Sequence, residues 1–418
     1  MTPPPTADML RVFGRIGLLS FGGPAAQIAL MHRELVETRP WLTEQQFLGA
    51  LSFCMLLPGP EAMQLATYAG WRLRGTMGGL LAGLLFVLPG AAVMLALASF
   101  YAAFGSVPLV EALFLGIKAT VIVIVLQALL KVSSRALNGS TAVVLAFAAF
   151  IAIFVFEVPF PLIILTAALV GALLMQGEAE PAPLTPVSTS ATLRTIAIWG
   201  ALWLAPVALL AVFAAPVLSD VALFFSTLAV VTFGGAYAVL AYMVQEVVGN
   251  FGWLTTGQMM DALGLAETTP GPLILVTQFV GFMAGEQAGG WWLGLLAALV
   301  TLWVTFVPCF LWIFAGAPYV EWIATRPRLT GALQGITAAV VGVIANLSIW
   351  FALNVWFTEV DRNRLGLWVP DATTIDISAL FLSGLAAALL LWRKTDLLAA
   401  LALMGGAGIV ASFLSESI

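Results

Sequence analysis

Two Pro-Gly-Pro triplets interrupt apolar stretches of this chain, one at Pro58-Gly59-Pro60 and one at Pro270-Gly271-Pro272. Proline lacks an amide donor and its ring clashes with the preceding turn, so each triplet predicts a break between two half-helices. The second half-helix of each pair starts with free amides, around Glu61 to Met63 and around Leu273 to Leu275, and such a terminus can bind an anion. Alternatively, each triplet only kinks a packed helix whose neighbours satisfy the freed backbone groups.

Two glycine pairs lie in comparable apolar stretches, at Phe21-Gly22-Gly23-Pro24 and at Phe233-Gly234-Gly235. Adjacent glycines permit a local break, and equally they permit the close approach of another helix. If these segments cross the proline breaks, four glycine-containing turns would frame one pocket. Backbone amides would suit a tetrahedral oxyanion there, because they do not lose a proton to it.

Two basic side chains are candidates for attracting an anion. Lys118 lies well inside an apolar stretch, and Arg15 lies about two helical turns inside the first one. Charged groups within a membrane segment are functional candidates by default. The alternatives are that Lys118 extends to the membrane interface and that Arg15 is a cytoplasmic anchor.

Two carboxylates flank the proline breaks, since Glu61 directly follows the first triplet and Glu267 directly precedes Thr268-Thr269 and the second triplet. Burial favours the protonated form of a carboxyl group, so either residue could couple proton movement to transport. Each could instead cap a helix terminus, because a negative charge is stabilising in a first helical turn.

The composition is that of a membrane protein. Hydrophobic residues make up 61% of the chain and charged residues 9%, whereas a soluble domain has about a quarter charged residues. Charge-free runs such as 287–320 and 329–358 exceed the roughly 20 residues that cross a bilayer as a helix. Barrel-type alternation is absent, so we predict an all-α polytopic membrane protein.

The same counts exclude several classes of chemistry. One histidine, His32, and two cysteines, Cys54 and Cys309, cannot supply a thiolate zinc site, a haem ligand pair or a disulfide framework. There is no Walker phosphate loop, and the net charge of −5 is scattered, which argues against nucleic acid as a partner. We therefore predict no catalytic residues, no metal and no cofactor. The start, MTPPPTADML, lacks the pattern of a cleavable signal peptide, so we expect none.

The chain matches itself when shifted by 212 residues, which places Phe21 on Phe233 and Pro58 on Pro270. The match resumes at a shift of 219, so the second copy holds about seven extra residues. We therefore divide the chain into a first repeat (1–176), a polar linker with a linking helix (177–220), and a second repeat (221–418). The linker is rich in Pro, Glu, Ser and Thr.

Each repeat has six apolar segments, and the linking helix brings the prediction to about 13 spans. The segments are 9–31, 44–72, 77–104, 109–130, 141–156 and 160–176 in the first repeat, and 221–243, 256–285, 291–314, 330–353, 377–392 and 397–413 in the second. With a cytoplasmic amino end most basic residues, Arg15 included, fall at cytoplasmic ends, whereas Arg33, Arg39, Arg362 and Arg364 fall outside. Because each repeat has an even number of segments, the single linking helix between them inverts the second repeat across the membrane. We therefore predict inverted-topology repeats with broken helices. A competing interpretation makes 44–72 a re-entrant hairpin, with the amino end outside.

These residues together resemble the chromate ion transporter family in its long, two-domain form. The resemblance is carried by Phe21-Gly22-Gly23-Pro24 with Gln27, by the Trp41-Leu42 pair, by Leu57-Pro58-Gly59-Pro60 with Gln64, and by the second-half segments Phe233-Gly234-Gly235 and Glu267-Thr268-Thr269-Pro270-Gly271-Pro272. It covers both repeats. One departure is Ala236, which stands where the first copy has Pro24.

The resemblance implies a secondary transporter in the bacterial inner membrane that exports chromate, driven by the proton-motive force, and so confers chromate resistance. Its expected partners are chromate, protons and the lipid bilayer, and we allow for a homo-oligomer. The alternatives are a carrier that imports sulfate or another oxyanion, and an anion channel. A membrane enzyme is disfavoured, because the few polar residues lie inside the apolar segments rather than clustered at an interface.

Overall fold

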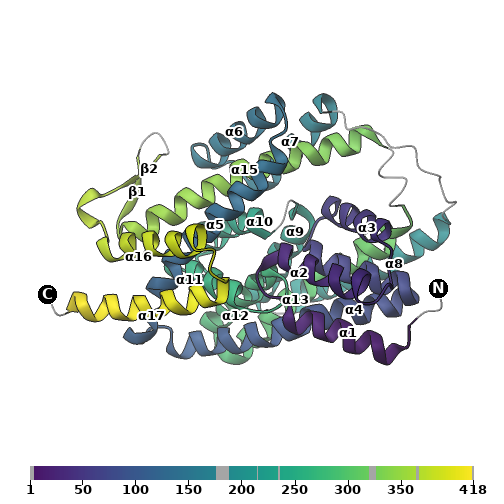
Figure 1. Cartoon of the computed structure of the whole chain (residues 1–418), viewed down its shortest axis with the longest axis horizontal. Coiled ribbons are helices and arrows are strands. Elements are labelled where there is room, and N and C mark those ends of the chain that lie inside the picture. Colours follow the sequence, from purple (N-terminus) through teal and green to yellow (C-terminus); the bar gives the residue numbers. More distant parts are fainter. Residues whose placement is uncertain are drawn as a thin grey trace. The chain divides into compact units, whose positions relative to one another are not determined.

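The computed structural model describes residues 4–175, 188–213, 215–233, 236–319, 326–363 and 367–416. Most of the predicted polar linker, together with Gly234 and Gly235, lies outside these ranges. The helices are α1 (Thr6–Leu19), α2 (Gly23–His32), α3 (Glu44–Leu56), α4 (Glu61–Phe104), α5 (Pro108–Ala136), α6 (Ser140–Phe154), α7 (Phe160–Leu174), α8 (Thr189–Phe213), α9 (Pro216–Val231), α10 (Ala236–Val244), α11 (Thr256–Thr268), α12 (Val276–Gly289), α13 (Trp291–Gly316), α15 (Pro327–Trp356), α16 (Ile377–Ala387) and α17 (Leu397–Glu416) (Figure 1).

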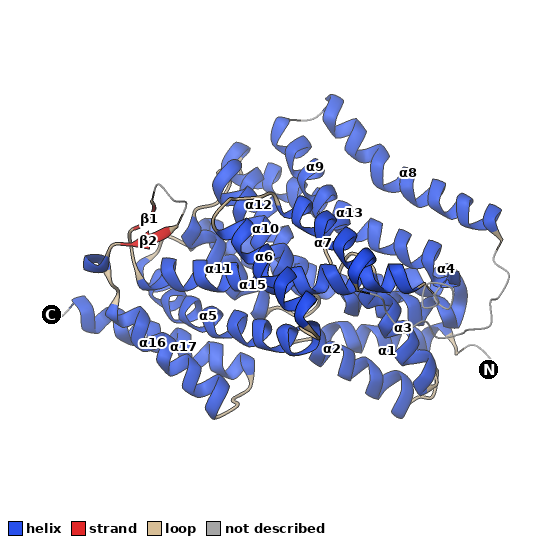
Figure 2. Cartoon of the chain, turned by 90° about the horizontal axis from the view of Figure 1, so that it is seen from above, coloured by secondary structure: helices blue, strands red, loops and turns tan. Residues whose placement is uncertain are grey.

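Short elements link some of these helices. They are η1 (Arg33–Glu37), η2 (Gln245–Asn250), η3 (Leu273–Leu275), η4 (Ala317–Tyr319), η5 (Ala372–Thr374), η6 (Ala388–Trp392) and the strands β1 (Val360–Arg362) and β2 (Trp368–Pro370). Within the described residues, the antiparallel pair β1–β2 is the one sheet, and helices form nearly all the rest (Figure 2). The chain is therefore an all-α protein, as its composition predicts.

Six described helical segments are long and apolar enough to cross a membrane. They are Glu61–Phe104, Pro108–Ala136, Thr189–Phe213, Trp291–Tyr319, Pro327–Trp356 and Leu397–Leu414. Four shorter apolar helices accompany them, at Ser140–Phe154, Phe160–Leu174, Pro216–Val231 and Ile377–Trp392. The chain is a multi-pass membrane protein, and the count of about 13 spans remains a prediction.

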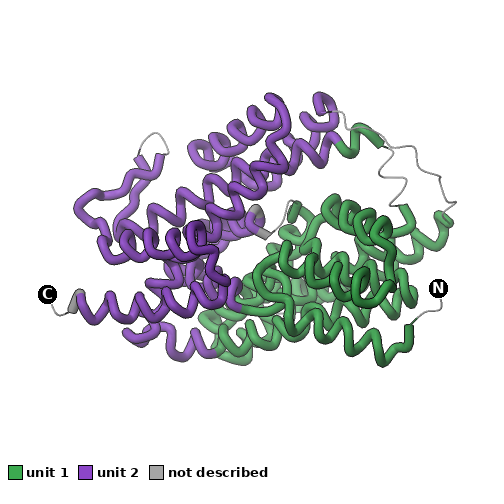
Figure 3. Tube along the Cα trace, in the orientation of Figure 1, with its two compact units in different colours: residues 1–99, 177–236, 269–330 green, residues 100–176, 237–268, 331–418 purple. Residues whose placement is uncertain are grey.

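The chain forms two compact units (Figure 3). Unit 1 comprises residues 1–99, 177–236 and 269–330, and unit 2 comprises residues 100–176, 237–268 and 331–418. Each unit contains segments of both sequence repeats. The structural units therefore do not coincide with the repeats.

The predicted segment 9–31 is not one continuous helix. Helix α1 ends at Leu19 and α2 begins at Gly23. The buried carboxylate of Glu34 contacts both Arg15 of α1, at 3.5 Å, and Arg39 beyond α2, at 2.6 Å. A continuous span would hold these two arginines at opposite ends of a helix, whereas the break lets the chain fold back on itself.

The second predicted span, 44–72, also breaks and folds back. Helix α3 ends at Leu56 and α4 starts at Glu61, and the ring centroids of Phe53 and Tyr68 lie 6.4 Å apart. A straight helix would separate two such residues by roughly 22 Å, at about 1.5 Å per residue. The re-entrant interpretation of this segment therefore describes its local shape better than a single span does.

Helix α4 is itself bent at Arg74 and Gly75, where the backbone leaves the helical region. Its two arms pack tightly, because a Cβ placed on Gly70 would lie 2.2 Å from the carbonyl oxygen of Gly78. Any side chain larger than hydrogen at Gly70 would separate the arms. The second arm is the long apolar helix that continues to Phe104.

Corresponding positions of the two sequence copies adopt the same local structure. The amide of Gln46 donates to Thr43 Oγ1, and the amide of Gln258 donates to Thr255 Oγ1, each at 3.2 Å. In both copies the glutamine side chain accepts the threonine amide in return, which is the reciprocal capping box. The same capping chemistry therefore starts α3 and α11.

Unit 2 is built around α5, which packs against α11, α16 and α17. The contact with α17 is close: a Cβ placed on Gly116 would lie 1.8 Å from the carbonyl oxygen of Met404. Small residues allow two apolar helices to approach within backbone contact, where van der Waals packing holds them together. This packing sets the position of Lys118, two residues further along α5.

Candidate functional site

The glycine break of the first repeat contacts the proline break of the second repeat within unit 1. The amide of Gly271 donates to the carbonyl of Ser20 at 2.8 Å. Gln27, which is buried, donates through Nε2 to the carbonyl of Gly271 at 2.7 Å and to that of Ser20 at 3.3 Å. Gly22 and Gly271 have φ values of +82° and +86°, a region that favours glycine. These two broken segments therefore contact each other through their backbones.

The other pair of breaks crosses in the same way, also within unit 1. The amide of Gly59, whose φ is +120°, donates to the carbonyl of Thr232 at 2.8 Å. Thr232 precedes Phe233, which is half-buried, and the following Gly234 and Gly235 lie outside the described residues. The 212-residue shift converts Gly59 into Gly271 and Ser20 into Thr232. The two crossings are therefore equivalent positions of the repeat.

These hydrogen bonds limit what the breaks can offer an anion, because both central glycine amides already have a carbonyl partner. Regular hydrogen bonding in α4 starts when the amide of Gln64 donates to the carbonyl of Pro60 at 3.0 Å. After the second break, the amide of Leu275 donates to the carbonyl of Pro272, also at 3.0 Å. The half-helices after the two breaks begin at the half-buried Glu61 and at the buried Leu273, and the predicted anion contacts lie at these two starts.

Two buried glutamines lie at the breaks. Gln64 donates through Nε2 to the carbonyl of Pro58 at 2.7 Å and so stabilises the first break, as Gln27 stabilises the second. Within the described part of the chain, neither Gln27 Oε1 nor Gln64 Oε1 has a hydrogen-bond partner. Two polar side chains at the crossings thus retain unused hydrogen-bonding capacity.

Arg15 is engaged in an ion pair. Its guanidinium lies 3.5 Å from Glu34, and Arg39 lies 2.6 Å from the other oxygen of the same carboxylate. Glu34 is buried, while the side chain of Arg15 is 59% exposed. The three side chains Arg15, Arg39 and Glu34 together carry a net positive charge, and Arg15 is the exposed member of this group.

Lys118 is also paired, which the sequence alone did not reveal. In unit 2 its Nζ lies 3.1 Å from Asp261 Oδ1, and the Tyr101 hydroxyl donates to Asp261 Oδ2 at 2.7 Å. The side chains of Lys118 and Asp261 are 23% and 7% exposed. Asp261 was visible as a carboxylate inside the predicted segment 256–285, but its partner belongs to a different helix, so only the packing of α11 on α5 identifies the pair.

Glu267 is buried near the end of α11 and accepts a hydrogen bond from the Tyr237 hydroxyl at 2.8 Å, also within unit 2. It therefore lies in a helix C-terminal turn, where a carboxylate does not cap the helix dipole. Glu267 and Tyr237 have no counterparts in the first repeat, which has Met55 and Ala25 at the corresponding positions. Capping is thereby a poor explanation for Glu267.

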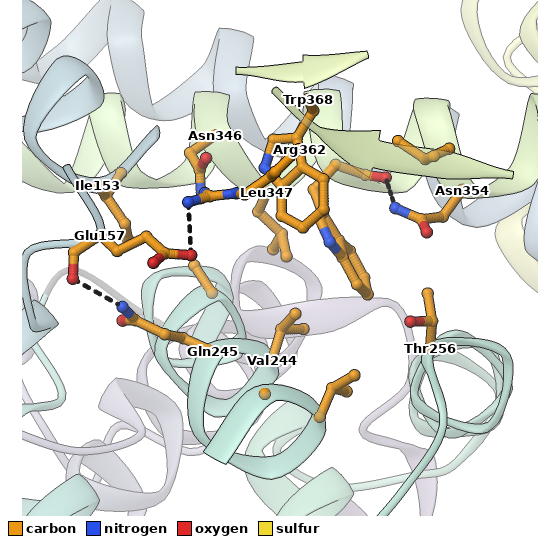
Figure 4. Close-up of a pocket in the computed structure, with 15 residues that line it drawn as sticks. Ile153, Glu157, Val244, Gln245, Thr256, Asn346, Leu347, Asn354, Arg362 and Trp368 are labelled. Carbon is orange, nitrogen blue, oxygen red and sulfur yellow. Dashed lines mark hydrogen bonds and ion pairs between the residues drawn. The ribbon is translucent and has the colours of Figure 1, made fainter. Parts of the chain in front are cut away.

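Unit 2 also contains a cavity of about 250 Å³ that the sequence did not suggest. Arg362 lies over the Trp368 ring, 4.4 Å from its centroid, and forms an ion pair with Glu157 (Figure 4). Helix α15 contributes Asn346 and Asn354 to the lining, and Thr256 of α11 adds a hydroxyl. The rest of the lining is largely apolar, and the arginine is already paired with a carboxylate.

Long apolar helices and broken segments with crossed backbones define a polytopic membrane protein with unwound backbone in its interior. The family model for the chromate transporter matches residues 7–172 and 219–410. The chain belongs to the chromate transporter family, and this membership points to a transporter rather than an enzyme.

Relatives are similar over most of their length. The chain is 33% identical to a chromate transport protein of Pseudomonas aeruginosa over 353 residues, which is 83% of this chain and 82% of the relative. It is 29% identical to a chromate transport protein of Cupriavidus metallidurans, covering 82% of each chain. An uncharacterized transporter of Methanocaldococcus jannaschii is 27% identical, covering 84% of this chain and 86% of the relative. No solved structure matches the chain.

Proposed function

We propose that this protein is a secondary active transporter of the bacterial inner membrane that exports chromate from the cytoplasm and so confers chromate resistance. The observation that carries the proposal is the pair of equivalent crossings in unit 1, Gly271 with Ser20 and Gly59 with Thr232. Membrane carriers place substrate where discontinuous helices expose their ends inside the protein. Family membership supports chromate as the substrate.

In unit 1 the proposed anion contacts are the half-helix starts that follow Pro58-Gly59-Pro60 and Pro270-Gly271-Pro272, together with the turn at Phe21-Gly22-Gly23. The predicted contacts Phe233-Gly234-Gly235 belong to the same proposal, and Gly234 and Gly235 lie outside the described residues. Arg15 adds positive charge to unit 1 while it stays paired with Glu34. In unit 2 the proposed cation is Lys118. Inversion of the second repeat belongs to the same proposal and is supported by the even number of apolar segments in each repeat.

The proposed driving force is the proton-motive force. An inside-negative potential expels a dianion, because each elementary charge gains about 2.3 kcal/mol per 100 mV. Proton coupling requires a buried carboxyl group, and Glu267 fits this role better than Glu61, since Glu61 is only half-buried and lies in a first helical turn.

The test is transport by the purified protein in sealed liposomes, with radiolabelled chromate and sulfate followed in parallel. Under an imposed pH gradient or membrane potential, we expect concentrative chromate movement that an uncoupler abolishes. Everted membrane vesicles show the direction of transport, because their cytoplasmic face points outward. Export from the cytoplasm should therefore appear as chromate accumulation inside these vesicles. Downhill movement that ignores the uncoupler would indicate a channel, and a preference for sulfate would replace the substrate. Absence of movement of either anion would contradict the proposal.

A further inference from the structure

The Lys118–Asp261 pair raises a problem for an anion transporter, because the cation that should attract the substrate is already neutralised by a carboxylate. We propose that Asp261 competes with the transported oxyanion for the Lys118 ammonium, so that the anion binds Lys118 together with a proton that Asp261 takes up. This inference rests on the proposed function, since it concerns the same substrate.

The surroundings of Asp261 suit such an exchange. Tyr101 holds Oδ2 with a hydrogen bond, and Oδ1 makes an ion-pair contact with Lys118 but accepts no well-aligned hydrogen bond from the described residues. Oδ1 is therefore the oxygen that can take a proton without breaking the hydrogen bond from Tyr101. Of the groups that act on Asp261, Lys118 attracts it and Glu111, an exposed carboxylate on the same helix as Lys118, repels it.

The start of helix α11 lies beside the Lys118 ammonium. A Cβ placed on Gly257 would lie 3.7 Å from Lys118 Nζ, in van der Waals contact with it. Gly257 is the second residue of α11, a helix of 13 residues, and the amide of the third residue, Gln258, is already bonded to Thr255. The amides of the first two residues and the positive end of the helix dipole favour an anion beside Lys118.

Charge and proton balance define the exchange. In the empty protein the ammonium of Lys118 faces the carboxylate of Asp261, and the pair is neutral. When a dianion such as chromate arrives with one proton, the proton forms an O–H bond at Asp261, and the ammonium pairs with the dianion instead. The loaded site therefore carries one negative charge rather than two. Binding of the anion and binding of the proton promote each other.

The sign of this linkage has a consequence for transport. The proton accompanies the anion in the same direction, so acid on the loading side favours loading. Export then depends on the membrane potential, which expels the single remaining negative charge, and a pH gradient that is alkaline inside opposes it. An antiporter that required the proton to leave before the anion could bind would show the opposite sign.

The test is proton uptake on chromate binding, measured with a pH indicator on the full-length purified protein in weakly buffered detergent solution. The pH is chosen so that chromate is entirely the dianion and cannot itself supply or take a proton. Wild type should take up a proton for each chromate bound. Asp261→Asn keeps the acceptor for Tyr101 and should bind chromate with no proton uptake. Glu359→Gln, which removes an exposed carboxylate outside α5 and α11, is the matched control and should behave as wild type.

Lys118→Gln removes the cation and should weaken chromate binding by at least about tenfold, as expected for loss of a partly buried charge contact. Wild-type protein that binds chromate without taking up a proton would overturn the inference, and this result does not depend on any variant folding. Proton uptake that persists in Asp261→Asn would overturn it as well. Failure of transport in liposomes would instead contradict the proposed function, because binding and proton uptake are measured without a membrane gradient.

Discussion

The amide of Gly59 donates to the carbonyl of Thr232 at 2.8 Å, and the residues 212 positions away make the reverse connection, from Gly271 to Ser20. Each repeat thus supplies a donor from its proline break and an acceptor from its glycine break. Inside a membrane an unpaired backbone group costs several kcal/mol, on the order of a lost hydrogen bond in an apolar medium. Reciprocal pairing lets two unwound segments exist there together, and it makes the halves depend on each other.

Replacing Gly59 with leucine should abolish chromate transport. Its φ of +120° is strained for any L-residue, and an added Cβ would lie 2.8 Å from Gln64 Nε2 and 2.9 Å from Cys309 Sγ. Strained backbone of this kind costs about 1–3 kcal/mol before the contacts are counted. We expect transport in liposomes to fall to background, and Gly271→Leu, at φ +86°, should act in the same way.

The matched control is Gly49→Leu in α3, where an added Cβ meets nothing within 4 Å. This variant should insert, remain folded and transport chromate like wild type. Normal transport by Gly59→Leu or Gly271→Leu would show that the corresponding break does not contribute to the anion path.

The breaks could be predicted from sequence because proline and adjacent glycines act locally, through a missing amide and a left-handed φ. The fold-back of α1 on α2 could not be predicted from sequence. One long membrane-spanning helix and two short helices that fold back on each other have the same pattern of apolar residues. Only the meeting of Arg15 and Arg39 at Glu34 reveals it.

The ion pair of unit 2 shows a second limit. Lys118 was recognisable because a charge inside an apolar stretch is rare, and Asp261 met the same criterion in another segment. What the sequence lacked was the packing of α11 on α5 that brings them to 3.1 Å. The hydrogen bonds from Tyr101 and Tyr237 to carboxylates depend on tertiary structure in the same way.

Glu267→Gln should uncouple chromate transport from an imposed gradient. The amide keeps a carbonyl acceptor for the Tyr237 hydroxyl but cannot exchange a proton, so the local structure should survive. We expect accumulation driven by the gradient to fall by at least about tenfold while exchange of internal for external chromate continues. The measurement compares both modes in one liposome preparation. Wild-type accumulation by this variant would remove Glu267 from the coupling path.

Tyr237→Phe separates positioning from proton exchange at the same site. Loss of the hydroxyl leaves the buried Glu267 without its hydrogen bond but leaves the carboxyl group able to titrate. We expect coupled transport to persist with a shifted pH profile, in contrast to its loss in Glu267→Gln. Identical behaviour of the two variants would indicate that the pair has a structural role alone.

The imidazole of His32 should make stability depend on pH at the end of α2. A hydrogen bond to Glu44, at 2.8 Å, raises the pKa of His32 above its ordinary value of 6.5, and the charges of Glu44 and Glu37 add to this effect. A raised folded-state pKa stabilises the protein fully below the ordinary pKa, and the contribution is lost as the pH rises through the raised value. The thermal midpoint of His32→Gln should therefore fall below that of wild type in acid and converge with it in alkali. An equal difference at both ends would contradict this assignment.

A double substitution distinguishes the structural from the functional role of the Lys118–Asp261 pair. Lys118→Met alone strands a carboxylate that is 7% exposed, which should cost about 3–5 kcal/mol of stability. Adding Asp261→Leu removes the stranded charge, and replacing both partners with apolar residues should restore stability to about the wild-type level or above it. Chromate binding should stay lost in the double variant, because the ammonium is gone. In the double variant the thermal stability should therefore recover while chromate binding does not, when both are measured on the same samples. Recovery of both would show that the pair holds the helices together without contacting the anion.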